Sequence, residues 1–103
     1  MIFEKLPNGD LYDYVSDCGA FSESMTRLLA RQLLFAVHSM NMQDLANRDL
    51  KLENILIDKD YNIKIVDFGF ASSISGSDGS GWNTSQLGTC SYMAPELHLK
   101  SSY

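Results

Sequence analysis

The sequence predicts an α+β fold that is mostly helical and contains one β-hairpin. Two segments in its first half carry apolar residues at helical spacing, and two short β-branched runs follow them. A length of 103 residues allows one modest domain. Eight basic and 13 acidic side chains give a net charge of −5, so the sequence lacks the excess of basic residues that is typical of nucleic-acid-binding proteins.

Two helices are predicted within residues 10–46. In the first, Leu11, Tyr14 and Val15 lie at helical spacing, and Gly19 is predicted to end the helix. Ser22 is a suitable N-cap for the second helix. We expect one face of this helix to belong to the core, because its apolar residues repeat at helical spacing: Met25, Leu28, Leu29, Leu33, Ala36, Val37 and Met40.

The apolar runs at residues 55–57 and 63–66 predict a hairpin with a polar tip. Three oxygen-bearing residues of this tip stand at the first, third and fifth positions of a calcium-binding loop: Asp58, Asp60 and Asn62. Ile63 and Gly69 occupy the positions where such a loop needs glycine and a bidentate glutamate. We therefore favour an ordinary turn over a calcium site.

Residues 72–86 are rich in serine and glycine and contain a lone Trp82. This composition offers too little apolar surface to fix one conformation, so it predicts a mobile loop. An Asp-Phe-Gly motif at 67–69 and an Ala-Pro-Glu motif at 94–96 bracket the loop. This position favours a long functional loop over a plain linker.

A polar loop, residues 47–54, lies between the second predicted helix and the hairpin. Burying its four charged side chains would be costly unless they have a function. Asp49 could orient and deprotonate a hydroxyl, and Lys51 could neutralise an anion at the same centre. Asn54 and Asp67 offer the few oxygen ligands expected for a magnesium ion that arrives with a nucleotide.

The polar loop resembles the catalytic loop of eukaryotic protein kinases, and the Asp-Phe-Gly and Ala-Pro-Glu motifs follow it in that family's order. The resemblance covers essentially the whole chain. It implies an excerpt of the protein-kinase fold, mostly from the helical large lobe, with a β-hairpin that carries the catalytic and metal motifs. The implied parts are the hinge (1–9), two helices (10–46), the catalytic loop (47–54), the hairpin with Asp-Phe-Gly (55–69) and the activation segment (70–96).

The resemblance implies a role for each polar residue of the predicted site. Asp49 resembles the catalytic base, and Lys51 resembles the γ-phosphate contact of serine/threonine kinases. Asn54 and Asp67 resemble the magnesium ligands. The implied cofactors are therefore ATP and Mg²⁺, and the implied substrate is the hydroxyl of a protein serine or threonine. Within the family, the sequence is loosely similar to kinases of the calcium/calmodulin type.

The same resemblance implies regulatory and adenine-binding residues. Arg48, beside the base, is expected to pair with a phosphorylated residue of the activation segment. Ser85 is the preferred candidate for that residue and Thr84 is its rival, which implies an upstream activating kinase. Glu4 and Leu6 align with the hinge that faces the adenine.

The sequence departs from the family pattern in two ways. Asn47 stands where the family has histidine or tyrosine, a ring that packs on the phenylalanine of Asp-Phe-Gly, here Phe68. The glycine-rich phosphate loop, the β3 lysine and its glutamate partner have no counterpart in the sequence. We therefore expect an excerpt of a longer kinase domain, and we do not expect the 103 residues alone to be active.

Two other functions remain open at this point. The chain could be an inactive kinase-like fragment that binds a partner, or a small metal-dependent hydrolase that uses Asp49 and Asp67. The N-terminus has neither a basic head nor a long apolar stretch, and the longest apolar run is far shorter than a membrane span. We therefore expect an intracellular, cytoplasmic protein without membrane or nucleic-acid partners. Cys18 and Cys90 form no metal-binding or disulfide pattern.

Overall fold

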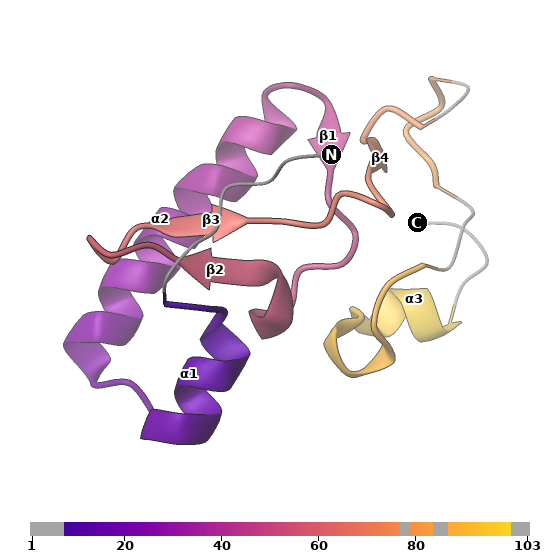
Figure 1. The fold of residues 1–103 in the computed structure, drawn as a ribbon. Coiled ribbons are helices and arrows are strands. Elements are labelled where there is room, and N and C mark those ends of the chain that lie inside the picture. The colour runs from indigo at the N-terminus through magenta and orange to yellow at the C-terminus, as the bar shows by residue number, and fades with distance from the viewer. Residues whose placement is uncertain (1–7, 77–78, 84–86, 100–103) are drawn as a thin grey trace. The chain divides into compact units, whose positions relative to one another are not determined.

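The structure is a computed structural model that describes residues 8–76, 79–83 and 87–99. The chain divides into two compact units: Met1–Ala36 with Leu52–Val66, and Val37–Lys51 with Asp67–Tyr103. Figure 1 shows the elements, whose bounds in chain order are α1 (Leu11–Cys18), α2 (Glu23–Asn41), β1 (Leu45–Ala46), the 3-10 helix η1 (Leu52–Asn54), β2 (Ile55–Ile57), β3 (Ile63–Ile65), β4 (Ser72–Ser73), the 3-10 helix η2 (Cys90–Tyr92) and α3 (Pro95–Leu99).

Both predicted helices are confirmed, and local caps set their ends. Asp10 caps α1, because its Oδ1 accepts the N–H of Asp13 at 2.8 Å. The helix ends at Gly19, which adopts a left-handed φ of 81° and donates its N–H to the Val15 carbonyl. Ser22 caps α2 as predicted, with its Oγ accepting the N–H of Met25 at 3.3 Å.

The predicted hairpin is confirmed in the first unit. β2 and β3 pair antiparallel, with Ile55 opposite Ile65 and Ile57 opposite Ile63. The Asp58 carboxylate accepts the backbone N–H groups of Asp60 and Asn62 at the tip, so it closes the turn in the manner of an Asx turn.

The core of the first unit lies between α1, α2 and the hairpin. Its buried residues are Leu11, Leu29, Ile55 and Ile57, and five partly buried residues pack against them: Phe21, Met25, Leu33, Leu52 and Ile63. The side-chain amide of Gln32 ties α2 to the hairpin, because it donates to the Tyr61 carbonyl and accepts the Ile63 N–H. The strand β2, which directly follows the polar loop, is therefore packed into the core of this unit.

The prediction that Leu28 of α2 belongs to the core is wrong. Leu28 is 47% exposed, while its neighbour Leu29 is buried. Successive residues of an α-helix point about 100° apart, so a core contact centred on Leu29 leaves Leu28 at its margin.

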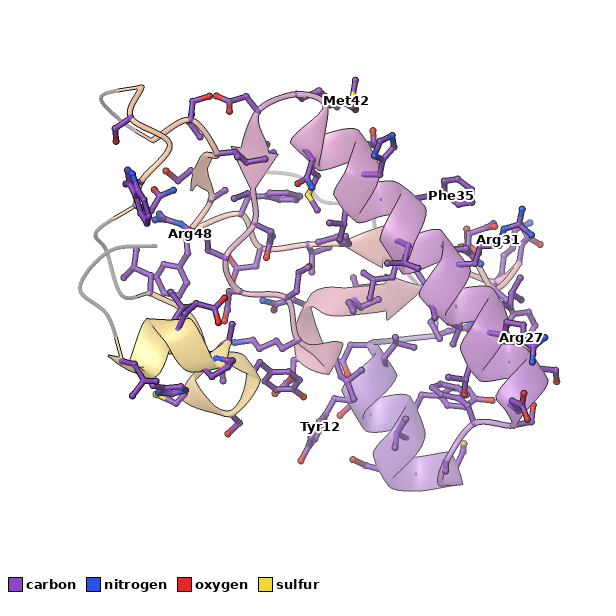
Figure 2. The ribbon with its side chains drawn as sticks, turned by 180° about the vertical axis from the view of Figure 1, so that it is seen from behind. Tyr12, Arg27, Arg31, Phe35, Met42 and Arg48 are labelled. Carbon is purple, nitrogen blue, oxygen red and sulfur yellow. The ribbon has the colours of Figure 1, made fainter. Side chains whose placement is uncertain are left out.

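Arg31 and Phe35 project outward from α2 in Figure 2, and the Arg31 guanidinium lies 5.6 Å from the centre of the Phe35 ring.

The second unit contains a strand pair that the composition did not predict. β1 and β4 pair antiparallel, with Leu45 opposite Ser73 and Ala46 opposite Ser72. The expectation of a mobile loop from residue 72 onward is therefore wrong at its start. The segment 10–46 contains the strand β1 in addition to the two predicted helices. The Asp44 carboxylate supports the pair by accepting from Ser73 and Ser75, and these hydrogen bonds lower the pKa of Asp44.

The physical reason for this correction is that the serine-rich segment obtains its order from partners outside it. The backbone of β1 supplies the hydrogen-bonding partners of β4, and the Asp44 carboxylate accepts hydrogen bonds from the serine hydroxyls.

Among the described residues, none of the helices is both long enough and apolar enough to cross a membrane. Cys18 and Cys90 are exposed free thiols.

Candidate active site

The catalytic-loop residues of the second unit adopt an unusual backbone. Arg48 has a φ of 66°, in the left-handed region that residues with side chains rarely adopt. The Asn47 Oδ1 accepts the backbone N–H of Asp49 at 3.0 Å and so closes a turn around Arg48. Asn47 and Asp49 are both buried, whereas the other three charged residues of the loop, Arg48, Lys51 and Glu53, are only partly buried.

Three side chains meet at the centre of this unit. The Lys51 Nζ lies 3.0 Å from the Asp49 Oδ2 and donates to the Thr89 Oγ1 at 2.9 Å. The Thr89 hydroxyl in turn donates to the Asp49 Oδ1 at 2.7 Å. The structure thus brings together Asp49 and Lys51, and it adds Thr89, which the sequence interpretation missed as a site residue.

These contacts keep Asp49 in its charged form. Burial raises the pKa of Asp49, but the hydrogen bond from Thr89 and the hydrogen bond and positive charge of Lys51 outweigh it. The net result is a pKa below the usual aspartate value. A carboxylate that stays deprotonated can accept a hydrogen bond from a substrate hydroxyl and orient it.

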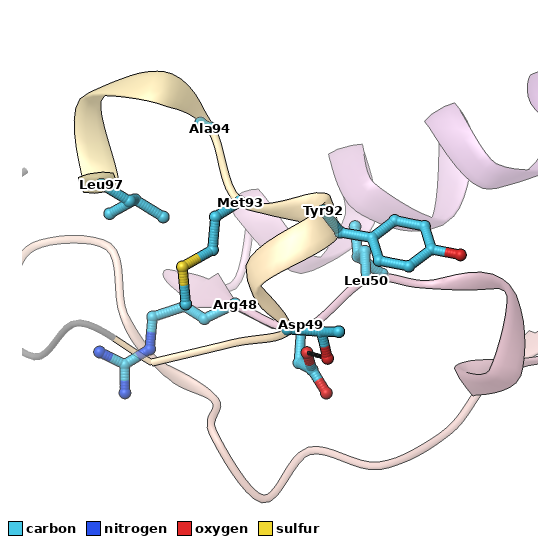
Figure 3. Close-up of a pocket in the computed structure, with 8 residues that line it drawn as sticks. Arg48, Asp49, Leu50, Tyr92, Met93, Ala94 and Leu97 are labelled. Atoms are coloured by element: carbon cyan, nitrogen blue, oxygen red, sulfur yellow. Dashed lines mark hydrogen bonds between the residues drawn. The ribbon is translucent and has the colours of Figure 1, made fainter. Parts of the chain in front are cut away.

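A pocket lies beside Asp49 within the same unit (Figure 3). It has a volume of about 230 Å³, and its lining includes Arg48 and Leu50 of the catalytic loop and Tyr92, Met93 and Leu97 of the segment from η2 to α3. The side chains of Met93 and Leu97 make part of this lining apolar. The carboxylate of Asp49 is therefore next to a space that a side chain of a bound polypeptide could enter.

Gly88 allows the activation segment to approach the catalytic loop closely. Its φ is 122°, and a Cβ at this position would lie 2.7 Å from the Arg48 carbonyl oxygen. Such a distance is too short for any side chain, so only glycine permits this path of the backbone. The approach carries the next residue, Thr89, to the Asp49 carboxylate.

Asp67 begins the Asp-Phe-Gly motif in an exposed, left-handed conformation with a φ of 59°. Its Oδ1 accepts the N–H of Gly69 at 3.0 Å, and its backbone carbonyl accepts from the Asn47 Nδ2 at 3.3 Å. Phe68 is 45% exposed, and the hydrogen bond from Asn47 to this motif goes to the backbone carbonyl of Asp67.

The second predicted magnesium ligand, Asn54, belongs to the first unit. It ends η1, is buried, and its backbone carbonyl accepts the N–H of Val66. The amide and carboxylate oxygens of Asn54 and Asp67 fit the preference of Mg²⁺ for a few oxygen ligands, and the Asp67 carboxylate is on the surface. A shared magnesium site formed by these two residues stays a prediction.

The predicted regulatory and hinge residues are only partly described. The Arg48 Nε donates to the Phe70 carbonyl at 2.6 Å, and its Nη1 lies 3.5 Å from the Asn83 Oδ1. Thr84, Ser85, Glu4 and Leu6 lie outside the described residues. Asn83 also accepts from Ser72 and donates to the Ser73 carbonyl, contacts that no sequence pattern predicted.

The comparisons with known proteins agree on one family. A family model described as the protein kinase domain matches residues 1–103. Maternal embryonic leucine zipper kinase of Danio rerio is 40% identical over 103 residues, which are 100% of this chain and 15% of the relative. Serine/threonine-protein kinase ppk16 of Schizosaccharomyces pombe is 42% identical over 97 residues, which are 94% of this chain and 14% of the relative.

A third relative is the liver/testis isoform of the phosphorylase b kinase gamma catalytic chain of Rattus norvegicus. It is 39% identical over 103 residues, which cover 99% of this chain and 24% of the relative. The chain thus spans about a quarter or less of the length of these curated relatives. These matches confirm the resemblance drawn from the catalytic-loop, Asp-Phe-Gly and Ala-Pro-Glu motifs. The chain belongs to the protein kinase domain family and, within it, to the serine/threonine kinases.

Proposed function

We propose that the protein containing this chain transfers the γ-phosphoryl group of ATP to serine and threonine hydroxyls of other proteins. The observation that carries this proposal is the contact of Asp49 with both Lys51 and Thr89 beside a pocket. The names of the relatives support the serine/threonine class. ATP with Mg²⁺ supplies the phosphoryl group and neutralises its charge when bound.

The chain's own residues would act on the substrate hydroxyl. Asp49, held deprotonated and buried, accepts a hydrogen bond from that hydroxyl and so orients its oxygen for attack. Lys51 brings a positive charge to the same centre, where negative charge gathers during transfer. Asn54 and Asp67 are the residues that would hold the metal ion.

The proposal includes regulation by an upstream activating kinase. Arg48 already reaches the activation segment through Asn83, two positions before Ser85. A phosphate on Ser85, or on its rival Thr84, would offer Arg48 a much stronger acceptor than a neutral amide. Glu4 and Leu6 are proposed to face the adenine, and the proposed setting is intracellular.

The test is phosphoryl transfer by the full-length protein and by its Asp49→Asn variant. The amide keeps the shape of the side chain but cannot take a proton, so we expect the rate to fall by about 10²-fold or more. Asp60→Asn is a matched control, because Asp60 is an exposed carboxylate at the hairpin tip. Undiminished activity of Asp49→Asn would refute the proposed base, and an inactive wild type would favour a binding role.

A further inference from the structure

Two residues of the candidate site adopt the left-handed backbone conformation without being glycine. Arg48, with a φ of 66°, directly precedes the proposed base Asp49. Asp67, with a φ of 59°, is itself one of the two proposed metal ligands. Conformations of this kind persist where the surrounding structure holds them, and they gather at functional sites. The question is what holds these two.

One side chain contacts the backbone beside both. The Asn47 Oδ1 accepts the N–H of Asp49 at 3.0 Å, which closes an Asx turn over Arg48. The Asn47 Nδ2 donates to the carbonyl of Asp67 at 3.3 Å, directly after the left-handed φ of that residue. Asn47 itself is only 4% exposed. The oxygen of this buried amide therefore binds the segment at Arg48, and its nitrogen binds the segment at Asp67.

We infer that Asn47 is a positioning residue that holds Asp49 and Asp67 through the two ends of a single amide. The inference rests on the proposed function for its kinetic consequences, but its structural part stands on the two hydrogen bonds. An amide offers a donor and an acceptor side by side and carries no charge. Asparagine at this position thus couples the catalytic loop to the Asp-Phe-Gly motif through backbone hydrogen bonds.

Two substitutions separate the two ends of the amide. Asn47→Asp keeps an oxygen that accepts the Asp49 N–H, but it places a second oxygen opposite the Asp67 carbonyl. Asn47→Leu has a similar size and removes both hydrogen bonds. Asn62→Leu is the matched control, because the Asn62 amide also hydrogen-bonds within a turn but belongs to the β2–β3 hairpin.

The first measurement is the hydrogen exchange rate of the Asp49 backbone N–H in the full-length protein. We expect Asn47→Leu to raise this rate about tenfold, because its acceptor is lost. Asn47→Asp and Asn62→Leu should change it less than about threefold. An unchanged rate in Asn47→Leu, or an equal rise in Asn62→Leu, would overturn the role of Asn47 in holding Asp49.

The second measurement is the Mg²⁺ concentration that gives half-maximal phosphoryl transfer. We expect Asn47→Asp to raise it about fivefold or more, since the backbone of the proposed ligand Asp67 loses its donor. A purely structural role would lower the amount of folded protein without moving this concentration. An unchanged Mg²⁺ dependence in Asn47→Asp would overturn the link to Asp67. An inactive wild type would refute the proposed function, and the exchange rates would still decide whether Asn47 holds Asp49.

Discussion

Replacement of Thr89 by valine is the sharpest test of how the candidate site works. Valine has nearly the shape of threonine, so the change removes the hydroxyl with little loss of packing. Two hydrogen bonds disappear: the one to the Asp49 Oδ1 at 2.7 Å and the one from the Lys51 Nζ at 2.9 Å. The direct pair between Lys51 and Asp49, at 3.0 Å, remains.

The expected magnitude follows from these contacts. A hydrogen bond to a charged group contributes about 1.5–3 kcal/mol. Because Asp49 and Lys51 still pair with each other, we expect the total loss of transition-state stabilisation to be that of about one such bond. A loss of about 1.5–3 kcal/mol corresponds to a decrease in kcat of about 10- to 160-fold.

The pH dependence gives a second signature of the same substitution. Thr89 helps to lower the pKa of Asp49, so the pKa rises when the hydroxyl is removed. A base works only when deprotonated, and activity therefore falls as the pH drops through its pKa. The acid limb of kcat/KM should move to higher pH in Thr89→Val and should stay in place in Thr89→Ser.

The assay is steady-state phosphoryl transfer by the full-length protein from about pH 3 to about pH 8, because the acid limb of the wild type is expected below the usual aspartate pKa. Thr89→Ser is the control, because serine keeps the hydroxyl and should retain activity within a few-fold. A Thr89→Val variant with kcat within twofold of the wild type and an unmoved acid limb would show that the hydroxyl has no part in positioning Asp49.

Two further predictions concern stability, measured as the free energy of unfolding of the full-length protein in denaturant. Gly88→Ala should lower the free energy of unfolding by about 2–4 kcal/mol, because its Cβ would lie 2.7 Å from the Arg48 carbonyl oxygen. Gly81→Ala is the control and should lower it by about 1 kcal/mol, because Gly81 also has a positive φ, 78°, but no atom lies within 4 Å of the new Cβ. Equal losses in the two variants would contradict the close approach of Gly88 to Arg48. Ile57→Ala should cost about 2–5 kcal/mol, because Ile57 is 2% exposed, and Leu34→Ala, at 70% exposure, should cost under about 1 kcal/mol.

Local signals in the sequence were sufficient for the helices and the hairpin. The caps at Ser22 and Gly19 act within a few residues of the ends they set, so their effect is visible in a short window of sequence. The pairing of Ile55–Ile57 with Ile63–Ile65 is also local, since the turn between them is short. The exposed position of Leu28 was missed, because periodicity alone does not fix the centre of a buried face.

Contacts between distant parts of the chain were not predictable in the same way. The Thr89 hydroxyl meets Asp49 across 40 positions, and β1 pairs with β4 across 26 to 28 positions. The pair Gly88-Thr89 before Ala-Pro-Glu was the available signal for the first contact. The role of Asn47 could not be read from its residue type, because it depends on where the Asp67 carbonyl lies.

The measurement that tests the central claim most directly is phosphoamino-acid analysis of a protein substrate after incubation with γ-labelled ATP, Mg²⁺ and the full-length protein. The account predicts label on serine and threonine, and no label with Asp49→Asn. Label on tyrosine alone, or equal labelling by wild type and Asp49→Asn, would contradict it.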